Sequence, residues 1–126
     1  MKKTINYILA AFFISSLASQ VSSTSQSTGN AISDAWIKVY QSDNSKQCQE
    51  NSGIPLEVML KKLNQQGIKV KCSQKNNNGM MHIQMCGGAT GIINVFEINR
   101  EDLKTAQKLG FNSVGTLDSY HDIVCK

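Results

Sequence analysis

The sequence predicts a small α+β domain, with an antiparallel sheet of three to four strands and two helices, tied together by disulfides. Three β-rich runs follow one another between Ile68 and Ile98, separated by two glycine-containing turns. Amphipathic helical patterns precede and follow this stretch, so each helix has a sheet to cover. The third observation is an even number of cysteines in a short chain, namely Cys48, Cys72, Cys86 and Cys125.

The N-terminus has the three parts of a secretory signal peptide. Met1-Lys2-Lys3 supplies the positive start, an apolar run extends from Tyr7 to Ile14, and small residues precede the expected cleavage after Ala18. The apolar run is too short to cross a bilayer about 30 Å thick as a helix. We therefore expect residues 1–18 to be removed, no transmembrane segment to remain, and the mature protein to be periplasmic or secreted.

The remainder of the chain is expected to form one domain behind a flexible leader. Residues 19–30 are rich in Ser, Thr, Gln and Gly and too polar to bury, which leaves residues 31–126 as a single α+β domain. Because Lys2 and Lys3 leave with the signal peptide, 11 of the 13 basic residues face 9 acidic ones. This near-neutral surface has no basic run interleaved with aromatic residues, so nucleic acid is not an expected partner.

The four cysteines are expected to form two disulfides, because the predicted compartment is oxidising and small exported domains are stabilised by such bridges. Their spacing contains no Cys-X-X-Cys pair, which argues against a thioredoxin-like redox motif and against a zinc ribbon. The pairing stays open, although the strand register described below disfavours a bridge between Cys72 and Cys86.

The first part of the domain is expected to supply a strand, a loop and a helix. Trp36 to Tyr40 has the β-branched and aromatic composition of a strand, and the polar stretch from Ser42 to Gly53 is a loop that carries Cys48. A helix then begins near Pro55 and stops at Gly67, which tolerates the left-handed conformation. Its apolar stripe has the spacing i, i+3, i+4, i+7 and consists of Leu56, Met59, Leu60 and Leu63.

The central stretch predicts a hairpin. Ile68 to Gln74 alternates, with Ile68, Val70 and Cys72 on one face, and Asn78-Gly79 is the strongest two-residue hairpin signal. Met80 to Cys86 is then the second strand of the hairpin. In this register Cys72 lies opposite Met85, Cys86 points to the other face, and the buried face is completed by Met81, Ile83 and Met85.

The last part of the chain predicts a central strand and the second helix. Ile92 to Ile98 is apolar on both faces, as in a central strand or one covered on each side. Asn99 is expected to cap the helix, assisted by Asp102, and Gly110 to end it. The apolar side of this helix consists of Leu103, Ala106 and Leu109. The polar tail that follows is expected to be a short strand or an extended segment tied down by Cys125.

The order of these elements, ending in Leu109-Gly110-Phe111, resembles that of small envelope domains such as the sporulation-related repeat, which binds peptidoglycan. The resemblance is one of pattern alone, and the strand from Gly91 to Ile98 is an addition to it. The chain is therefore assigned to no family.

Soft metal ligands gather between Met80 and Cys86, where thioethers, an imidazole and a thiol fall within seven residues. Such ligands select Cu(I), and on a strand Met80, His82 and Cys86 would share one face. A Cu(I) carrier that uses these three side chains is therefore an alternative function, and it requires Cys86 to be reduced. Against it, methionine is common core filler, and Met81 and Met85 point to the opposite face.

A small secreted hydrolase is the second alternative. A cysteine nucleophile needs a histidine within hydrogen-bond reach, and the candidates are Cys86 with His82 or His121. An acid pair could be drawn from Glu97, Glu101 and Asp102, but carboxylates in a first helical turn are explained by the helix dipole. Because no convergent polar cluster is visible, the sequence predicts an exported, non-catalytic binding module of the cell envelope without a cofactor. Its expected partner is an envelope protein or a cell-wall component.

Overall fold

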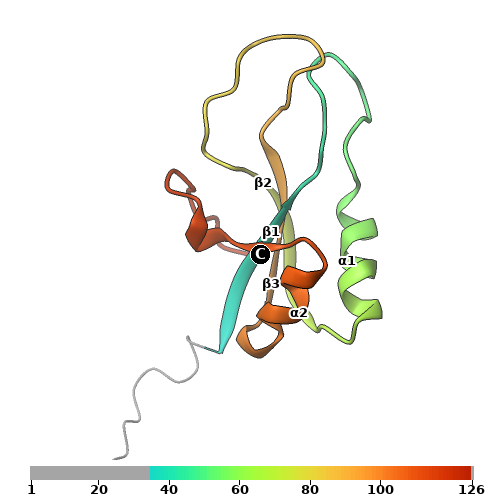
Figure 1. Cartoon of the computed structure of the whole chain (residues 1–126), viewed down its shortest axis with the longest axis vertical. Coiled ribbons are helices and arrows are strands. Elements are labelled where there is room, and N and C mark those ends of the chain that lie inside the picture. The colour runs from blue at the N-terminus through green and yellow to red at the C-terminus, as the bar shows by residue number, and fades with distance from the viewer. Residues whose placement is uncertain (1–34, 126) are drawn as a thin grey trace, which may run out of the picture.

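The computed structural model describes residues 35–125, and within them the protein is an α+β domain with a four-stranded antiparallel sheet. The predicted signal peptide and leader lie outside the described residues. The strands have the order β2-β3-β1-β4, so the longest apolar strand, β3, is central (Figure 1). In chain order the elements are β1 (Trp36–Ser42), α1 (Leu56–Gln65), β2 (Val70–Asn77), β3 (Ile92–Asn99), a 3-10 turn (Arg100–Asp102), α2 (Leu103–Lys108), β4 (Asn112–Ser113) and a second 3-10 turn (Val114–Thr116).

The main core lies between the sheet and the two helices. The predicted stripe of α1 is confirmed, because Met59 and Leu63 are buried and Leu56 and Leu60 pack against them. Alternate residues of β3 and β1 meet this stripe from the sheet side. Phe96 also meets Phe111 edge to face, with ring centroids 5.7 Å apart. The buried members of the core are Val39, Met59, Leu63, Ile68, Phe96, Ile98, Ala106 and Phe111.

The helix ends follow the capping signals with one exception. Gly67 (φ +75°) and Gly110 (φ +95°) both take the left-handed conformation after the two helices, as predicted. The side chain of Asn99 accepts a hydrogen bond from the Glu101 amide at 3.2 Å, so Asn99 caps the 3-10 turn that leads into α2 and not α2 itself. The assisting role predicted for Asp102 is wrong, since its side chain makes no capping hydrogen bond and α2 begins only after it.

The second face of the sheet is covered by the C-terminal segment, residues 117–125. Ile93 and Val95 point away from the helices and are nevertheless buried, which confirms the prediction that this strand is covered on both sides. The segment is tied to β2 by the Cys72–Cys125 disulfide. It also receives hydrogen bonds on its carbonyl groups, among them Lys38 Nζ and Gln74 Nε2 to the oxygen of Ile123 at 2.9 and 3.0 Å.

The strand predicted at Met80–Cys86 does not form, and the two-residue turn predicted at Asn78-Gly79 is wrong. Instead β2 pairs directly with β3 from Asn77 opposite Ile92, and residues 78–91 form a loop between them. The Asn-Gly pair still bends the chain. The Asn78 side chain accepts from the Met80 amide at 3.0 Å and Gly79 has φ +77°, but this local turn leads into a loop.

A β-bulge in β2 corrects a second prediction. The register shifts between Val70, which is opposite Ile98, and Cys72, which is opposite Glu97. This extra residue moves Cys72 from the helix-facing side, where Val70 lies, to the side covered by the C-terminal segment. Cys72 is there joined to Cys125, and the remaining pair is Cys48–Cys86. The expectation of two disulfides is therefore confirmed for the four cysteines.

Candidate functional site

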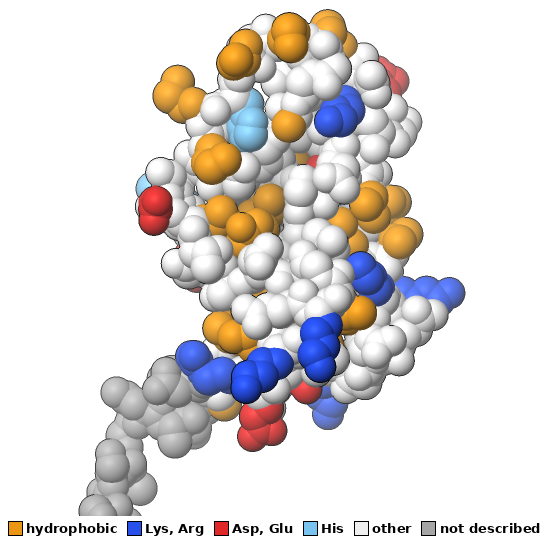
Figure 2. Space-filling model, in the orientation of Figure 1, with side chains coloured by type: hydrophobic (Ala, Val, Ile, Leu, Met, Phe, Trp, Pro, Cys, Tyr) orange, Lys and Arg blue, Asp and Glu red, His pale blue; other side chains and the backbone are white. Residues whose placement is uncertain are grey.

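The most unusual surface feature is the loop of residues 78–91, which we call the methionine loop. It carries four large apolar side chains that point into solvent, with Met81 101% and Ile83 82% exposed. Met80 and Met85 are also more than half exposed. The prediction that Met81, Ile83 and Met85 complete a buried face is wrong, because the segment has no sheet partner. The loop lies at one end of the long axis of the molecule (Figure 1), where Figure 2 shows hydrophobic side chains gathered at the surface.

The exposure of these side chains does not come from a loose backbone. Gln47, in the preceding loop, inserts its side chain into the methionine loop and makes three hydrogen bonds to its backbone. Its Nε2 donates to the carbonyl oxygens of Ile83 at 2.8 Å and Ala89 at 2.9 Å, and its Oε1 accepts from the Met85 amide at 3.0 Å. The Cys48–Cys86 disulfide, one residue further along each chain segment, fixes the two loops covalently. The apolar side chains are therefore displayed on a preorganised backbone.

The base of the methionine loop is closed by His82. Its Nε2 lies 3.2 Å from Asn78 Oδ1, and the half-buried ring packs on Gly91 at the end of the loop. A Cβ atom at Gly91 would lie 2.4 Å from His82 Nε2, and φ is +79° there, so only glycine fits without movement. This packing gives His82 a structural role in holding the two ends of the loop together.

The residues proposed as copper ligands are brought only partly together. Met80 and His82 line one hollow of about 490 Å³, which Cys48 also lines. Cys86 is bonded to Cys48, so in this form its sulfur is not a thiolate and cannot serve as the third soft ligand. The copper alternative required a reduced Cys86, and it stays a prediction for the reduced protein alone.

A buried polar cluster lies where the methionine loop and the loop that carries Cys48 meet β2. The carboxylate of Asp43 is almost fully buried and accepts hydrogen bonds from Lys75 Nζ at 2.8 Å, Ser45 Oγ at 2.6 Å and the Ser45 amide at 2.9 Å. Burial by itself would raise the pKa of Asp43. The hydrogen bonds from Lys75 and Ser45 and the positive charge of Lys75 together outweigh burial, so the pKa is lowered. Asp43 therefore stays ionised, and its bond to Lys75 ties the loop that carries Cys48 to β2.

Asp43 borders a groove of about 640 Å³ that Ser45, Lys75, Thr90 and the first turn of α1 also line. Four of its polar side chains, those of Asp43, Ser45, Lys75 and Thr90, are engaged with one another. Besides the Asp43 contacts, the hydroxyl groups of Ser45 and Thr90 lie 2.5 Å apart. This mutual satisfaction indicates a structural junction more than an open binding site.

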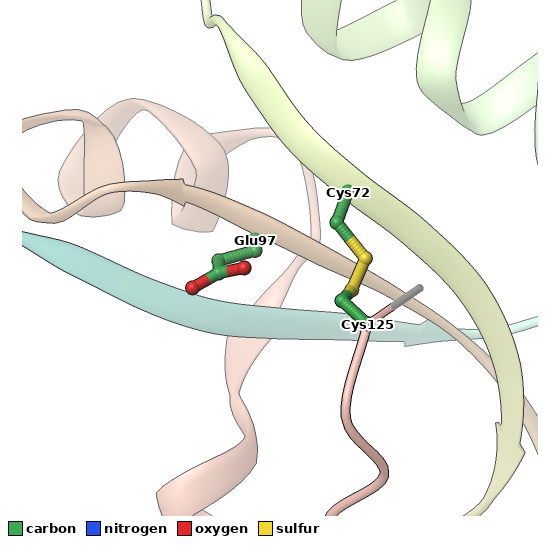
Figure 3. A group of neighbouring side chains, drawn as sticks. All are labelled: Cys72, Glu97 and Cys125. Carbon is green, nitrogen blue, oxygen red and sulfur yellow. A yellow bond between two sulfur atoms is a disulfide. The ribbon is translucent and has the colours of Figure 1, made fainter.

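The side chains of Cys72, Glu97 and Cys125 form a third cluster, in which one ligand atom from each lies within 4.8 Å of the others (Figure 3). The two sulfur atoms are bonded to each other, so the cluster offers a metal ion a single carboxylate while the disulfide is intact. Glu97 moreover lies 3.5 Å from Lys71 Nζ. A structural zinc site takes four ligands, and this cluster is better described as a disulfide with an ion pair beside it.

The groups considered for hydrolysis have no thiolate partner within the described residues. Within residues 35–125 no cysteine is free, so Cys86 cannot act as a thiolate in this form. His121 is exposed in the C-terminal segment, where its carbonyl oxygen accepts from Asn76 Nδ2 at 3.0 Å. Glu101 and Asp102 lie in the 3-10 turn before α2, as expected of carboxylates that complement a helix N-terminus.

Sequence reasoning missed Gln47, Asp43 and Lys75, the residues that hold the loops. Each is a polar residue in or beside a polar stretch, and the partner that fixes its loop lies more than 30 positions away. Asp43 directly follows the observed strand β1, but the strand predicted from the sequence ended at Tyr40 and Asp43 lay in the predicted loop. Comparison with family models, with curated proteins and with solved structures gives no significant match. Among residues 35–125 there is also no helix of the length and apolar character needed to cross a membrane.

Proposed function

We propose that the protein is an exported, non-catalytic binding module of the cell envelope, periplasmic or secreted, and that it contacts its partner through the methionine loop. The observation that carries the proposal is the set of four exposed apolar side chains on a backbone fixed by Gln47 and by a disulfide. Contiguous exposed apolar surface on a small soluble domain marks an interaction site more often than a defect. Export is supported by the N-terminal sequence and by two disulfides, which persist in oxidising compartments.

Binding without catalysis is supported by the kind of groups that the loop presents. Methionine side chains are flexible and polarizable, so they adapt to irregular apolar partners. The loop backbone, in contrast, is held rigid, which reduces the conformational entropy lost on binding. Nucleophilic chemistry would need a free thiolate or a comparable activated group, and the cysteines of the described chain are all bridged.

The proposal is tested by comparing three forms of the mature protein in cells and in envelope extracts. The wild type is compared with a loop variant carrying Met81→Ser, Ile83→Ser and Met85→Ser, and with a control variant carrying Val58→Ser and Val124→Ser. Val58 and Val124 are exposed apolar residues outside the loop, at 56% and 81%. We expect the wild type and the control to be retained on the same envelope component and the loop variant to be lost from it. Equal retention of all three forms would contradict the proposal.

A further inference from the structure

We propose that the surface bound by the methionine loop is the interface of a phospholipid bilayer, into which the loop inserts its apolar side chains to the depth of the headgroup boundary. This inference rests on the proposed function and names the chemistry of the partner. The position of the loop, the hydrogen bonding of its backbone and the distribution of charge around it favour a bilayer as the partner.

The position of the loop suits a flat partner. The methionine loop lies at one end of the molecule's long axis, and the loop that carries Cys48 lies beside it (Figure 1). Met81 and Ile83 are the most exposed side chains of the loop, and hydrophobic atoms reach the outline of the surface at this convex end (Figure 2). A convex end can meet a flat bilayer without rearrangement of the rest of the domain, whereas a protein partner would need a matching groove.

The backbone of the loop is partly satisfied by hydrogen bonds within the protein. In the apolar part of a bilayer each unsatisfied N–H or C=O group is strongly destabilising, so inserted loops must satisfy these groups internally. Gln47 does this for part of the loop, since its side chain bonds the carbonyl oxygens of Ile83 and Ala89 and the amide of Met85. The amides of residues 81–84 have no acceptor among the described residues, and at the headgroup boundary they remain in contact with water. The Gly88 amide donates to the carbonyl oxygen of Met85 at 2.9 Å, and the Gly88 carbonyl accepts from the Gln47 amide at 2.9 Å.

The charges around the loop agree with insertion by apolar contact. Residues 78–91 contain no Lys, Arg, Asp or Glu. Exposed charges of both signs border the loop: Lys46, which pairs with Ala89 in an isolated β-bridge, and Glu50 lie in the neighbouring loop, and Asp118 adjoins Ser119, which lies against Gly79. The long side chain of Lys46 can place its amine at the level of the headgroups. Because Lys46 and Glu50 have opposite signs, electrostatic attraction adds little, and binding should depend only weakly on salt.

The experiment uses the mature protein with both disulfides formed and sucrose-loaded vesicles of phosphatidylethanolamine and phosphatidylglycerol at a ratio of 3:1. Sedimentation measures the partition coefficient at low and high salt for the wild type, for Met81→Ser with Ile83→Ser, and for Val58→Ser with Val124→Ser. Burial of a large apolar side chain corresponds to about a tenfold change in partition or more. We expect the loop variant to lose at least about tenfold, while the control pair stays within twofold of the wild type.

A second measurement locates the contact. In protein labelled with ¹³C at the methionine methyl groups, a spin label in the acyl region of the same vesicles should broaden the signals of Met81 and Met85. Met59, which is buried in the core at 2% exposure, serves as an internal control and should stay sharp. This readout also separates loss of insertion from loss of folding, because the Met59 signal reports an intact core in every variant.

Three results would overturn the lipid inference: no partition of the wild type into the vesicles, equal partition of the loop variant, or broadening that spares Met81 and Met85. If the vesicles are not bound but the loop variant still loses retention on an envelope protein, the partner is a protein and the proposed function stands. If neither vesicles nor envelope components distinguish the loop variant from the wild type, both proposals fail.

Discussion

Gln47 is the residue on which the geometry of the methionine loop most depends, and Gln47→Ala tests this directly. The substitution removes three hydrogen bonds, of 2.8, 2.9 and 3.0 Å, between its side chain and the backbone of residues 83–89. Each such bond contributes about 0.5–1.5 kcal/mol net. Because the loop is at the surface, water replaces part of what is lost, and we expect the lower end of the sum, about 1.5 kcal/mol.

This loss should be local. The Cys48–Cys86 disulfide still ties the two loops, and the core between the sheet and the helices does not include Gln47. The melting temperature should therefore change little, while the free energy of local opening falls. A loss of about 1.4 kcal/mol raises the opening equilibrium tenfold, so the amide of Met85 should exchange about ten times faster with solvent deuterium.

Amide exchange followed by NMR measures this, with Gln84→Ala as the matched control. Gln84 is exposed in the same loop, and its side chain makes no hydrogen bond to any residue of the described part of the chain. We expect Gln84→Ala to leave the Met85 amide unchanged. Unaltered Met85 exchange in Gln47→Ala, or an equal change in both variants, would refute the claim that Gln47 holds the loop.

Three further predictions concern stability. Leu63→Ala should lower the free energy of unfolding by about 2–5 kcal/mol, because it empties a fully buried site. Met81→Ala, at an exposed site, should change the free energy of unfolding by less than about 0.5 kcal/mol, and urea denaturation measures both variants. The lowered pKa of Asp43 means that its stabilisation is full above the ordinary value of 3.8 and is lost as the pH falls through the lower folded value. Asp43→Asn should thus lower the free energy of unfolding at pH 7 by about 1–3 kcal/mol. It should also reduce the loss of stability that the wild type shows below about pH 5, and an unchanged pH dependence would contradict this. Replacing Cys72 and Cys125 together by Ala should lower stability by about 2–4 kcal/mol and deprotect the amides of residues 117–125, and retained protection would show that the disulfide is not what holds the segment.

Local sequence patterns predicted the structure correctly where the conformation of a segment depends only on nearby residues. The stripe of α1 and its stop at Gly67 were predicted because helical periodicity and a left-handed glycine act within a few residues. The double apolar face of β3 was predicted because a central strand must be buried on both sides. The α+β class followed from these elements and is confirmed.

The predictions that failed depend on contacts between distant segments. Met80–Cys86 alternates as a strand does, but a strand also needs a neighbour, and the place beside β2 is taken by β3. The bulge between Val70 and Cys72 is likewise determined by pairing across the sheet, and no residue in the sequence of β2 predicts it. The pairing of the cysteines could not be deduced from spacing, because three connectivities are possible for four cysteines.

The failed strand and the candidate site are the same segment, and there is a physical reason for this. A run of apolar residues that folded into the sheet would gain the free energy of burial, yet Met80, Met81, Ile83 and Met85 remain in water. Their segment is instead held in place by the Gln47 side chain and by the Cys48–Cys86 disulfide. Local rules are most often broken at functional sites, where stability is given up for an interaction with something outside the chain. The mismatch between the pattern of this segment and its burial is therefore the strongest argument that the methionine loop binds a partner.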